Sequence, residues 1–259
     1  MTYPQINPIA FDFGFIQIHW YGLMYLLAFI SAYLLARRRA KSSPDWDNQQ
    51  VEDMIFFGAL GVVLGGRIGY VLFYDFAYFI SEPLSIFAIQ NGGMSFHGGF
   101  LGVLLAMFWF NRKYHKTFFT TMDFVAPLVP LGLGFGRIGN FINNELWGKI
   151  SDSPLAIFIQ QEGLSRYPSQ LYQALLEGLA LFLILWIFSK KPRPNMSISA
   201  LFLIFYGLFR VVVEFVRVPD AQLGYLAFGW LTMGQILSFP MIIFGIYLLQ
   251  KAYSKPHRA

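Results

Sequence analysis

The stretch GFGRIGNFINNELWGK occupies residues 134–149, at the end of a long apolar run. Arg137 lies a few residues inside that run, and Asn140 and Glu145 follow at its edge. Charged side chains are rare inside membrane spans, and they face a polar cavity or a partner when they occur there. The stretch therefore predicts a membrane-spanning helix with a polar cavity near one end.

The composition of the 259-residue chain is that of an integral membrane protein. Hydrophobic residues make up 56% of the chain and its mean hydropathy is +0.51, both high for a soluble domain. The chain has no cysteine, which excludes disulfides, thiolate metal ligands and a cysteine nucleophile. The first basic residue is Arg37, so no basic segment precedes the first apolar one, and we expect that helix to be retained rather than cleaved.

Seven apolar stretches approach the length of about 20 residues that a spanning helix needs. They are 17–36, 54–74, 96–111, 121–141, 170–189, 198–217 and 231–250. We therefore expect an all-α integral membrane protein with seven transmembrane helices, forming one polytopic domain over residues 1–259. The outer connections 75–95, 142–169 and 218–230 are expected to form a small external cap.

Clusters of Lys and Arg test this number of spans. With seven spans, the clusters that follow the first, third, fifth and seventh all fall on one side, which the positive-inside rule makes cytoplasmic. The amino terminus is then outside and the carboxyl terminus is cytoplasmic, and the net charge of +5 needs no nucleic-acid partner. The clusters are Arg37, Arg38, Arg39 and Lys41; Arg112, Lys113 and Lys116; Lys190, Lys191 and Arg193; and Lys251, Lys255 and Arg258.

Polar residues from five of the expected helices share the outer half of the membrane. On the stretch 198–217, Tyr206, Arg210 and Glu214 recur every four residues and therefore share one helix face. Arginine presents a rigid fork of donors that matches phosphate, so its excess at one depth favours a site for an anion. The residues at this depth are Tyr21, Arg67, His97, Arg137, Asn140, Glu145, Arg210 and Glu214.

Each of these residues also has a plainer explanation. His97 could cap a helix, Tyr21 could belong to an aromatic belt, and Arg67 could reach lipid headgroups. Arg210 and Glu214 could be a structural ion pair. Gly58, Gly61, Gly65 and Gly69 have the spacing of residues that let helices pack closely.

Other classes of function fit less well. A metal site has poor support, because only two histidines reach the outer side and no paired histidine motif is present. Ser95 and His97 are too close in sequence to define a serine-protease triad. A transporter would use the same arginines but should line a route to the inner face, where Asp123 and Glu177 are the main polar residues. A structural scaffold would leave the arginines unexplained.

The motif GRIGNFINNELWG, residues 136–148, resembles the signature of bacterial prolipoprotein diacylglyceryl transferases. The segments IHWYGLMY (18–25), HGGFLG (97–102) and YGLFRVVVEFVRVPD (206–220) resemble the same family in the expected order, so the resemblance covers nearly the whole chain. It implies seven spans, no cofactor and a location in the bacterial cytoplasmic (inner) membrane, with the site toward the periplasmic or external leaflet. The implied reaction transfers the sn-1,2-diacylglyceryl group of phosphatidylglycerol to the lipobox cysteine of a preprolipoprotein signal peptide. It forms a thioether and releases glycerol-1-phosphate, as the first step of lipoprotein maturation.

The resemblance and this chemistry together suggest roles for the residues. Arg137 and Arg210 would stabilise the charge on the departing phosphate, and Glu214 would orient Arg210. His97 is the candidate base for the thiol, because an imidazole exchanges protons near neutral pH; alternatively, it only positions the lipid, and another group or water takes the proton. The remaining candidates would contact the headgroup or peptide, or allow close backbone approach: Tyr21, Arg67, Gly98, Asn140, Glu145, Gly148 and Tyr206.

Overall fold

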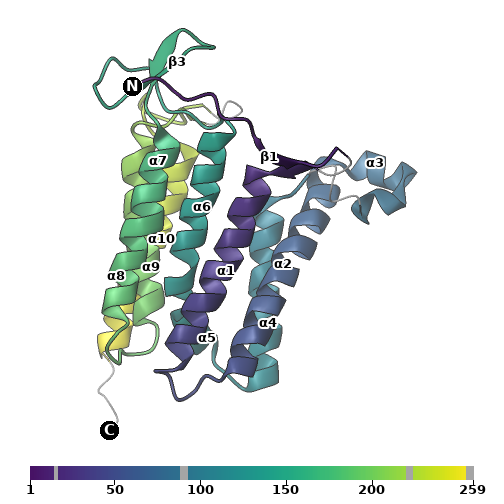
Figure 1. The fold of residues 1–259 in the computed structure, drawn as a ribbon. Coiled ribbons are helices and arrows are strands. Elements are labelled where there is room, and N and C mark those ends of the chain that lie inside the picture. Colours follow the sequence, from purple (N-terminus) through teal and green to yellow (C-terminus); the bar gives the residue numbers. More distant parts are fainter. Residues whose placement is uncertain (15–16, 88–92, 220–223, 255–259) are drawn as a thin grey trace. The chain divides into compact units, whose positions relative to one another are not determined.

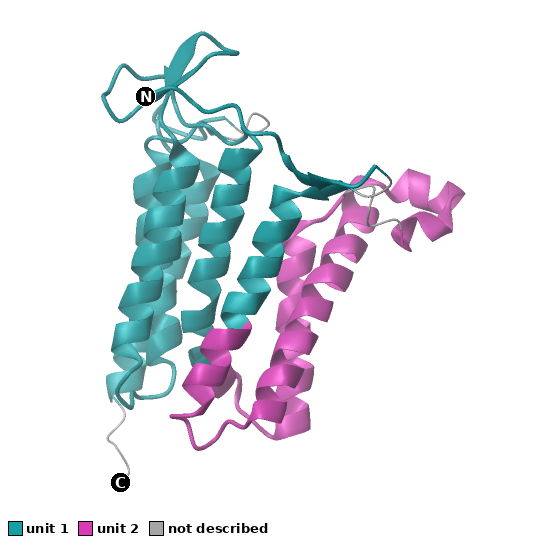
Figure 2. Cartoon of the chain, viewed as in Figure 1, with its two compact units in different colours: residues 1–32, 122–259 teal, residues 33–121 magenta. Residues whose placement is uncertain are grey.

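A computed structural model describes residues 1–14, 17–87, 93–219 and 224–254 (Figure 1). Parts 88–92 and 220–223 of the expected cap, with Lys255 and Arg258, lie outside the described residues. The chain divides into two compact units (Figure 2). Unit 1 contains Met1–Ala32 and Met122–Ala259, and unit 2 is Tyr33–Thr121. The single polytopic domain expected from the sequence stays a prediction.

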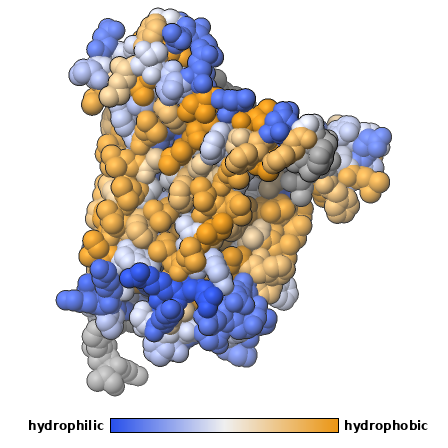
Figure 3. All heavy atoms as spheres, in the orientation of Figure 1, coloured by the Kyte–Doolittle hydropathy of each residue, from blue (hydrophilic) through white to orange (hydrophobic). Residues whose placement is uncertain are grey.

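Six helical segments of the described residues are long and apolar enough to cross a membrane, so the chain is a multi-pass membrane protein. Apolar side chains cover the visible face of the helices, and polar side chains collect at the helix ends (Figure 3). The six segments are α1 (Trp20–Ala40), α2 (Asn48–Tyr74), Phe118–Ile142, Ser169–Phe188, α9 (Ser197–Glu214) and α10 (Met233–Ser254). The remaining expected span is also a helix, the 19-residue α4 (Phe96–Tyr114), which is not among the six.

In unit 2, α2 packs against α4 through glycines on both helices. A Cβ on Gly61 would lie 2.6 Å from the carbonyl oxygen of Gly102, and one on Gly69 would lie 2.7 Å from the Cα of Gly98. Gly65 is equally close to the backbone of α4. The predicted packing role is therefore confirmed for these three glycines, whereas Gly58 makes only ordinary contact with α4.

The two helices of this pair run antiparallel. The glycine contacts lie near the carboxyl end of α2 and the amino end of α4, while Lys113 at the end of α4 forms an ion pair with Asp53 near the start of α2. The connection between them contains the short helix α3 (Phe76–Ser81) and the 3-10 helix η1 (Pro83–Phe87).

In unit 1, two of the spans are interrupted helices. The span Phe118–Ile142 consists of α5 (Phe118–Val125), a 3-10 turn η3 (Ala126–Leu128) and α6 (Val129–Ile142). Pro127 and Pro130 lie at these junctions, where their missing N–H groups remove helical hydrogen bonds. The span Ser169–Phe188 consists of α7 (Ser169–Gln173), a π-helical segment η4 (Ala174–Ala180) and α8 (Leu181–Phe188).

Short strands accompany the helices outside the spans. β1 (Ile9–Asp12) pairs antiparallel with β2 (Gln17–His19), and β3 (Ile157–Ile159) pairs antiparallel with β4 (Leu164–Arg166). The all-α expectation holds for the spans, but the sequence reading did not predict these hairpins. In a three-residue strand the apolar alternation is too short to be distinguished from an apolar loop.

The amino terminus joins the β3–β4 hairpin and supports α6. The Tyr3 N–H donates to the Phe158 carbonyl at 2.9 Å, and the Phe158 N–H donates to the Met1 carbonyl at 2.8 Å. The buried Tyr3 hydroxyl contacts the carbonyl oxygens of Phe141 and Ile142, at 2.9 and 3.0 Å. These carbonyls belong to the last turn of α6, where helical hydrogen bonds run out, and the Asn144 N–H also donates to the Phe141 carbonyl at 3.1 Å. The first residues of the chain therefore cap the helix that carries Arg137.

Candidate functional site

The predicted polar face of α9 is built around an ion pair. Arg210 Nη2 lies 2.7 Å from Glu214 Oε1, and Arg217 Nη1 lies 3.1 Å from the same oxygen. Glu214 is 1% exposed, so its charge is compensated by these two guanidinium groups rather than by solvent. Arg217 was not among the residues predicted for the site, although it continues the same helix face one turn further on.

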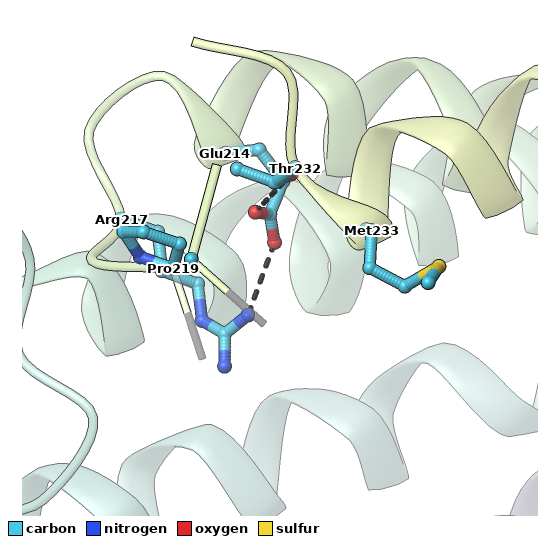
Figure 4. A pocket seen from close by; sticks show the side chains of 7 residues that line it. Glu214, Arg217, Pro219, Thr232 and Met233 are labelled. Atoms are coloured by element: carbon cyan, nitrogen blue, oxygen red, sulfur yellow. Dashed lines mark hydrogen bonds and ion pairs between the residues drawn. The ribbon is translucent and has the colours of Figure 1, made fainter. Parts of the chain in front are cut away.

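The second oxygen of Glu214 has a partner from the next helix. The Thr232 hydroxyl donates to Glu214 Oε2 at 2.7 Å. Figure 4 shows Glu214, Arg217 and Thr232 on the wall of a small pocket, with Pro219 and Met233 beside them. Both oxygens of the carboxylate are therefore held.

Glu177 is a further charged residue of this cluster, and the sequence reading left it out of the site. Its side chain is 1% exposed, and its Oε1 lies 4.0 Å from Arg210 Nη1. That oxygen has no hydrogen-bond partner among the described residues. The sequence reading grouped Glu177 with the inner halves of the helices, but it lies beside Arg210, in the half of α9 that the same reading placed on the outer side. The available signal was its position only eight residues into a span that begins at Ser169.

Glu177 also lies on irregular backbone. The segment η4 is π-helical, and single π-turns are frequent at functional sites because the extra residue redirects a side chain. The same turn packs tightly on α6, since a Cβ on Gly178 would lie 2.7 Å from the Cα of Gly134. Glu177 is thus carried toward the helix that holds Arg137.

Arg137 begins a chain of polar contacts on α6. Its Nη1 donates to Asn140 Oδ1 at 3.4 Å, and Asn140 Nδ2 donates to Glu145 Oε1 at 2.8 Å. The ionisable groups whose electric fields act most on Arg137 are Glu177, Arg210, Tyr206 and Arg217. Unit 1 therefore brings together three arginines, two buried carboxylates and a tyrosine, which come from α6, from η4, and from α9 and the residues just after it.

The loop after α6 is held in a strained form. Asn144 and Leu146 have φ angles of 58° and 61°, in the left-handed region that residues other than glycine rarely adopt. The buried Ser169 hydroxyl donates to the Leu146 carbonyl at 2.7 Å, and the buried Gln170 amide donates to the Glu145 carbonyl. Strain of this kind persists only where the surroundings enforce it, and it is concentrated at functional sites.

Gly148 lies at the end of this loop, in close contact with the backbone of Tyr167 and Val216. A Cβ at this position would lie 2.5 Å from the Val216 carbonyl oxygen and 2.8 Å from that of Tyr167. The sequence reading assigned Gly148 to close approach of substrate. The close approach that the structure contains is instead between Gly148 and the protein's own chain after α9.

Tyr21 belongs to the same unit. A Cβ on Gly139 would lie 2.8 Å from its ring, so the tyrosine packs directly on α6. Tyr25, Glu145 and Arg137 are the ionisable groups that act on its hydroxyl. Tyr21 thus packs on the helix that carries Arg137 and Asn140.

Arg67, in unit 2, is largely occupied by backbone carbonyls. Its Nε donates to Ile86 at 2.9 Å and its Nη1 donates to Gly93 at 3.0 Å, with a further bond from Nη2 to Ser85. The guanidinium group therefore ties the connection between α2 and α4 to α2. This geometry gives Arg67 a structural task, whereas the sequence reading assigned it to substrate.

His97 lies in the first turn of α4, and its side chain is exposed in the structure of unit 2. The turn is capped by Ser95, whose Oγ accepts from the Gly98 N–H at 3.1 Å. Gly98 itself packs against Gly65 and Gly69 of α2. The predicted site residues thus fall into two sets: Arg67, His97 and Gly98 in unit 2, and the other eight in unit 1.

Among the described residues, no three side chains of the usual ligand types are grouped so that they could hold a metal ion. The chemistry available in unit 1 is that of arginines, carboxylates and hydroxyl groups at a helix end, which suits an anion such as a phosphodiester.

Comparisons with known proteins agree with a site that binds a phosphodiester. Residues 8–251 match the family model described as prolipoprotein diacylglyceryl transferase. The phosphatidylglycerol–prolipoprotein diacylglyceryl transferase of Pseudomonas paraeruginosa is 60% identical over 257 residues, covering 98% of this chain and 97% of that protein. The protein of the same name from Pseudomonas fluorescens Pf-5 is 58% identical over 264 residues, covering 100% and 97%.

Proposed function

The chain belongs to the prolipoprotein diacylglyceryl transferase family, and we propose that it transfers the diacylglyceryl group of phosphatidylglycerol to the lipobox cysteine of preprolipoproteins. The chain is a transferase and a multi-pass membrane protein. The substrates follow from the names of its relatives. The observation within the structure that supports the proposal is the cluster of Arg137, Arg210 and Arg217 around buried carboxylates.

The proposed reaction is a displacement at carbon. The cysteine sulfur attacks the glycerol carbon that is bonded to the phosphate oxygen. A carbon–sulfur bond forms, the carbon–oxygen bond breaks with its electron pair going to that oxygen, and glycerol-1-phosphate leaves. The thiol proton passes to a base. The product on the protein side is the thioether-linked diacylglyceryl cysteine.

The arginines supply stabilisation for the leaving group. Charge grows on the phosphate oxygen as the bond breaks, and fixed guanidinium donors in a setting of low dielectric constant stabilise it strongly. Arg137 and Arg210 are the proposed donors. Glu214 orients Arg210 through the 2.7 Å ion pair, and Glu177 limits its movement from the other side at 4.0 Å.

Asn140, Glu145, Tyr21 and Tyr206 are proposed to shape the headgroup pocket beside the arginines. The contacts that support this are the hydrogen bond from Asn140 to Glu145 at 2.8 Å and the packing of the Tyr21 ring on Gly139 of α6. Tyr206 lies one turn before Arg210 on α9. Each of the four is therefore on or against a helix that carries one of the proposed arginines.

The thiol requires activation, because a free cysteine has a pKa of about 8.5 and is mostly protonated at neutral pH. His97 is the proposed base. Its exposed side chain at the amino end of α4 and the absence of a side chain on Gly98 are compatible with access by a peptide.

Seven spans are proposed, although six helices of the described residues qualify by length and apolar character. Tyr3 pairs directly with Phe158, so these residues lie on the same side of the membrane. An even number of crossings must therefore separate them. The segments between them are α1, α2, α4 and Phe118–Ile142, and leaving out α4 would make the number odd.

The direction of insertion follows from the charges. With α4 counted as a span, the four basic clusters lie on one side, which the positive-inside rule makes cytoplasmic. The amino terminus, the β3–β4 hairpin and the arginine cluster then face the periplasmic or external side of the bacterial inner membrane.

The direct test is reconstitution. Protein purified in detergent is given phosphatidylglycerol with or without a lipobox peptide, and released glycerol-1-phosphate is measured. The proposal expects release only when the cysteine peptide is present and none with a peptide carrying serine instead. Release without any peptide would indicate a lipase, and binding without release would indicate a lipid carrier.

A further inference from the structure

The amino end of α10 begins with a reciprocal cap. The Thr232 Oγ1 accepts from the Gln235 N–H at 3.3 Å, and Gln235 Oε1 accepts from the Thr232 N–H at 3.0 Å. This capping box satisfies N–H groups that an isolated helix leaves without partners. Thr232 is 2% exposed and Gln235 is fully buried, so the cap is shielded from water.

Thr232 has a second task that a cap alone does not require. Capping uses only the acceptor side of a hydroxyl group, which leaves the O–H free to donate. In this structure the O–H donates to Glu214 Oε2 at 2.7 Å (Figure 4). The first turn of α10 also points the positive end of the helix dipole toward this carboxylate.

Gly234 allows the helix to come this close. A Cβ on Gly234 would lie 2.6 Å from Glu214 Oε1 and 3.2 Å from Arg210 Nε. Any side chain at this position would push the ion pair away from α10. Thr232 and Gly234 therefore form one surface that fits the Arg210–Glu214 pair.

We propose that Thr232 and Gly234 are positioning residues that lock Glu214 in the one orientation in which it holds Arg210 and Arg217 together. Thr232 occupies Oε2, so rotation of the carboxylate would break either that bond or the contacts of Oε1 at 2.7 and 3.1 Å. The guanidinium group of Arg210 is then fixed in direction before lipid arrives. The consequence for catalysis rests on the proposed function, whereas the consequence for binding of an anionic lipid does not.

Three substitutions of Thr232 separate capping from positioning. Thr232→Ser keeps both the acceptor and the donor. Thr232→Asp keeps a strong helix cap but, when ionised, has no proton to donate to Glu214. Thr232→Val keeps the shape and loses both. If Thr232 only caps α10, the serine variant should behave like the original protein, and Thr232→Asp should behave like threonine in a Glu214→Gln background, where no carboxylate repels the aspartate.

The measurements are the affinity of the purified protein for short-chain phosphatidylglycerol and its turnover with a lipobox peptide. We expect Thr232→Ser to stay within about threefold of the original protein, and Thr232→Asp and Thr232→Val to lose about 10- to 100-fold in affinity, as expected for a hydrogen bond to a charged group. Full affinity in the aspartate variant would overturn the proposal.

A double-mutant cycle covers the case in which the aspartate variant fails to fold. In a Glu214→Gln background, Thr232→Val should cause little further loss, because the carboxylate it positions is gone. Equal losses in both backgrounds would overturn the proposal. If the original protein binds phosphatidylglycerol but modifies no peptide, the proposed function fails while the binding comparison still tests the role of Thr232.

Discussion

Arg210 Nη2 and Glu214 Oε1 lie 2.7 Å apart across one turn of α9, with Glu214 fully enclosed by protein. Removing one member of a buried pair leaves the other charge without compensation, at a cost of about 3–5 kcal/mol. Replacing either residue of the pair should therefore lower the stability of this part of the protein strongly. The same carboxylate also holds Arg217.

Glu214→Gln should lose most of the transferase activity while the protein still inserts and remains monodisperse in detergent. The amide keeps the shape but no longer holds two guanidinium groups by charge. A cycle with Arg210→Gln should be non-additive by about 0.5–3 kcal/mol, the range for residues in one network. Additive losses in turnover would show that the two residues act separately.

Arg137→Ala should abolish transfer, and Arg137→Lys should not restore it. Lysine keeps the charge, but it cannot reproduce a planar fork that reaches both Asn140 and a phosphate. Turnover of phosphatidylglycerol with a lipobox peptide checks this. Full activity with lysine would mean that charge alone matters, and full activity with alanine would remove Arg137 from the site.

His97→Asn should bind phosphatidylglycerol almost normally, because the arginines remain, while its turnover falls by about 10²–10⁴-fold, the usual contribution of a positioned base. Raising the pH toward the pKa of the substrate thiol should recover part of the loss, since thiolate then forms without help. The check is a pH–rate profile beside a lipid-binding titration. A loss that does not change with pH, or a collapse of lipid affinity, would rule out the base role.

Reporters fused after Lys113 or Lys191 should read cytoplasmic, and one near Asp152 should read external. The reason is that the proposed topology counts α4 as a span, which puts the basic clusters on one side and keeps Tyr3 and Phe158 on the same side. Alkaline phosphatase and green fluorescent protein fusions give opposite signals for the two sides. An external signal from the Lys191 fusion would contradict the seven-span topology.

Gly61→Ala should lower the thermal unfolding temperature, whereas Gly58→Ala, one turn earlier on α2, should not. The added methyl group at Gly61 would lie 2.6 Å from a backbone oxygen of α4, but the one at Gly58 would make an ordinary 3.8 Å contact. Overpacking of this kind costs about 1–3 kcal/mol. Equal unfolding temperatures for the two variants would show that the helices can separate without cost.

The sequence indicated which candidate residues are neighbours where both lie on one helix, because such signals are local. The spacing of Tyr206, Arg210 and Glu214 defines one face of a helix, and Arg137 with Asn140 does the same on α6. Glu177 was missed because it was assigned to the inner half of the membrane, although it lies only eight residues into the span that begins at Ser169. Thr232 was not predicted as part of the site because its partner, Glu214, lies on another helix, and sequence spacing does not show such contacts.

Arg67 is a residue that the sequence assigned to the substrate but that the structure shows bonded to backbone. Its depth in the membrane suggested a ligand, but its donors are occupied by the carbonyls of residues 85, 86 and 93. Carbonyls in a connection of irregular structure have no sequence signature, so an arginine that serves them cannot be distinguished in advance from one that binds phosphate. Residue type and depth identify a buried charge, but its partner depends on tertiary structure.

The contact between Tyr3 and the far end of α6 has a consequence for biogenesis. The Tyr3 hydroxyl meets carbonyls 138 and 139 residues away, and its backbone pairs with Phe158. Tyr3 is synthesised long before Phe141, Ile142 and Phe158. It therefore lacks these partners until the segment after α6 has been made. The last turn of α6, and with it the setting of Arg137, is completed only after residues 141–158 have been synthesised and have met Tyr3.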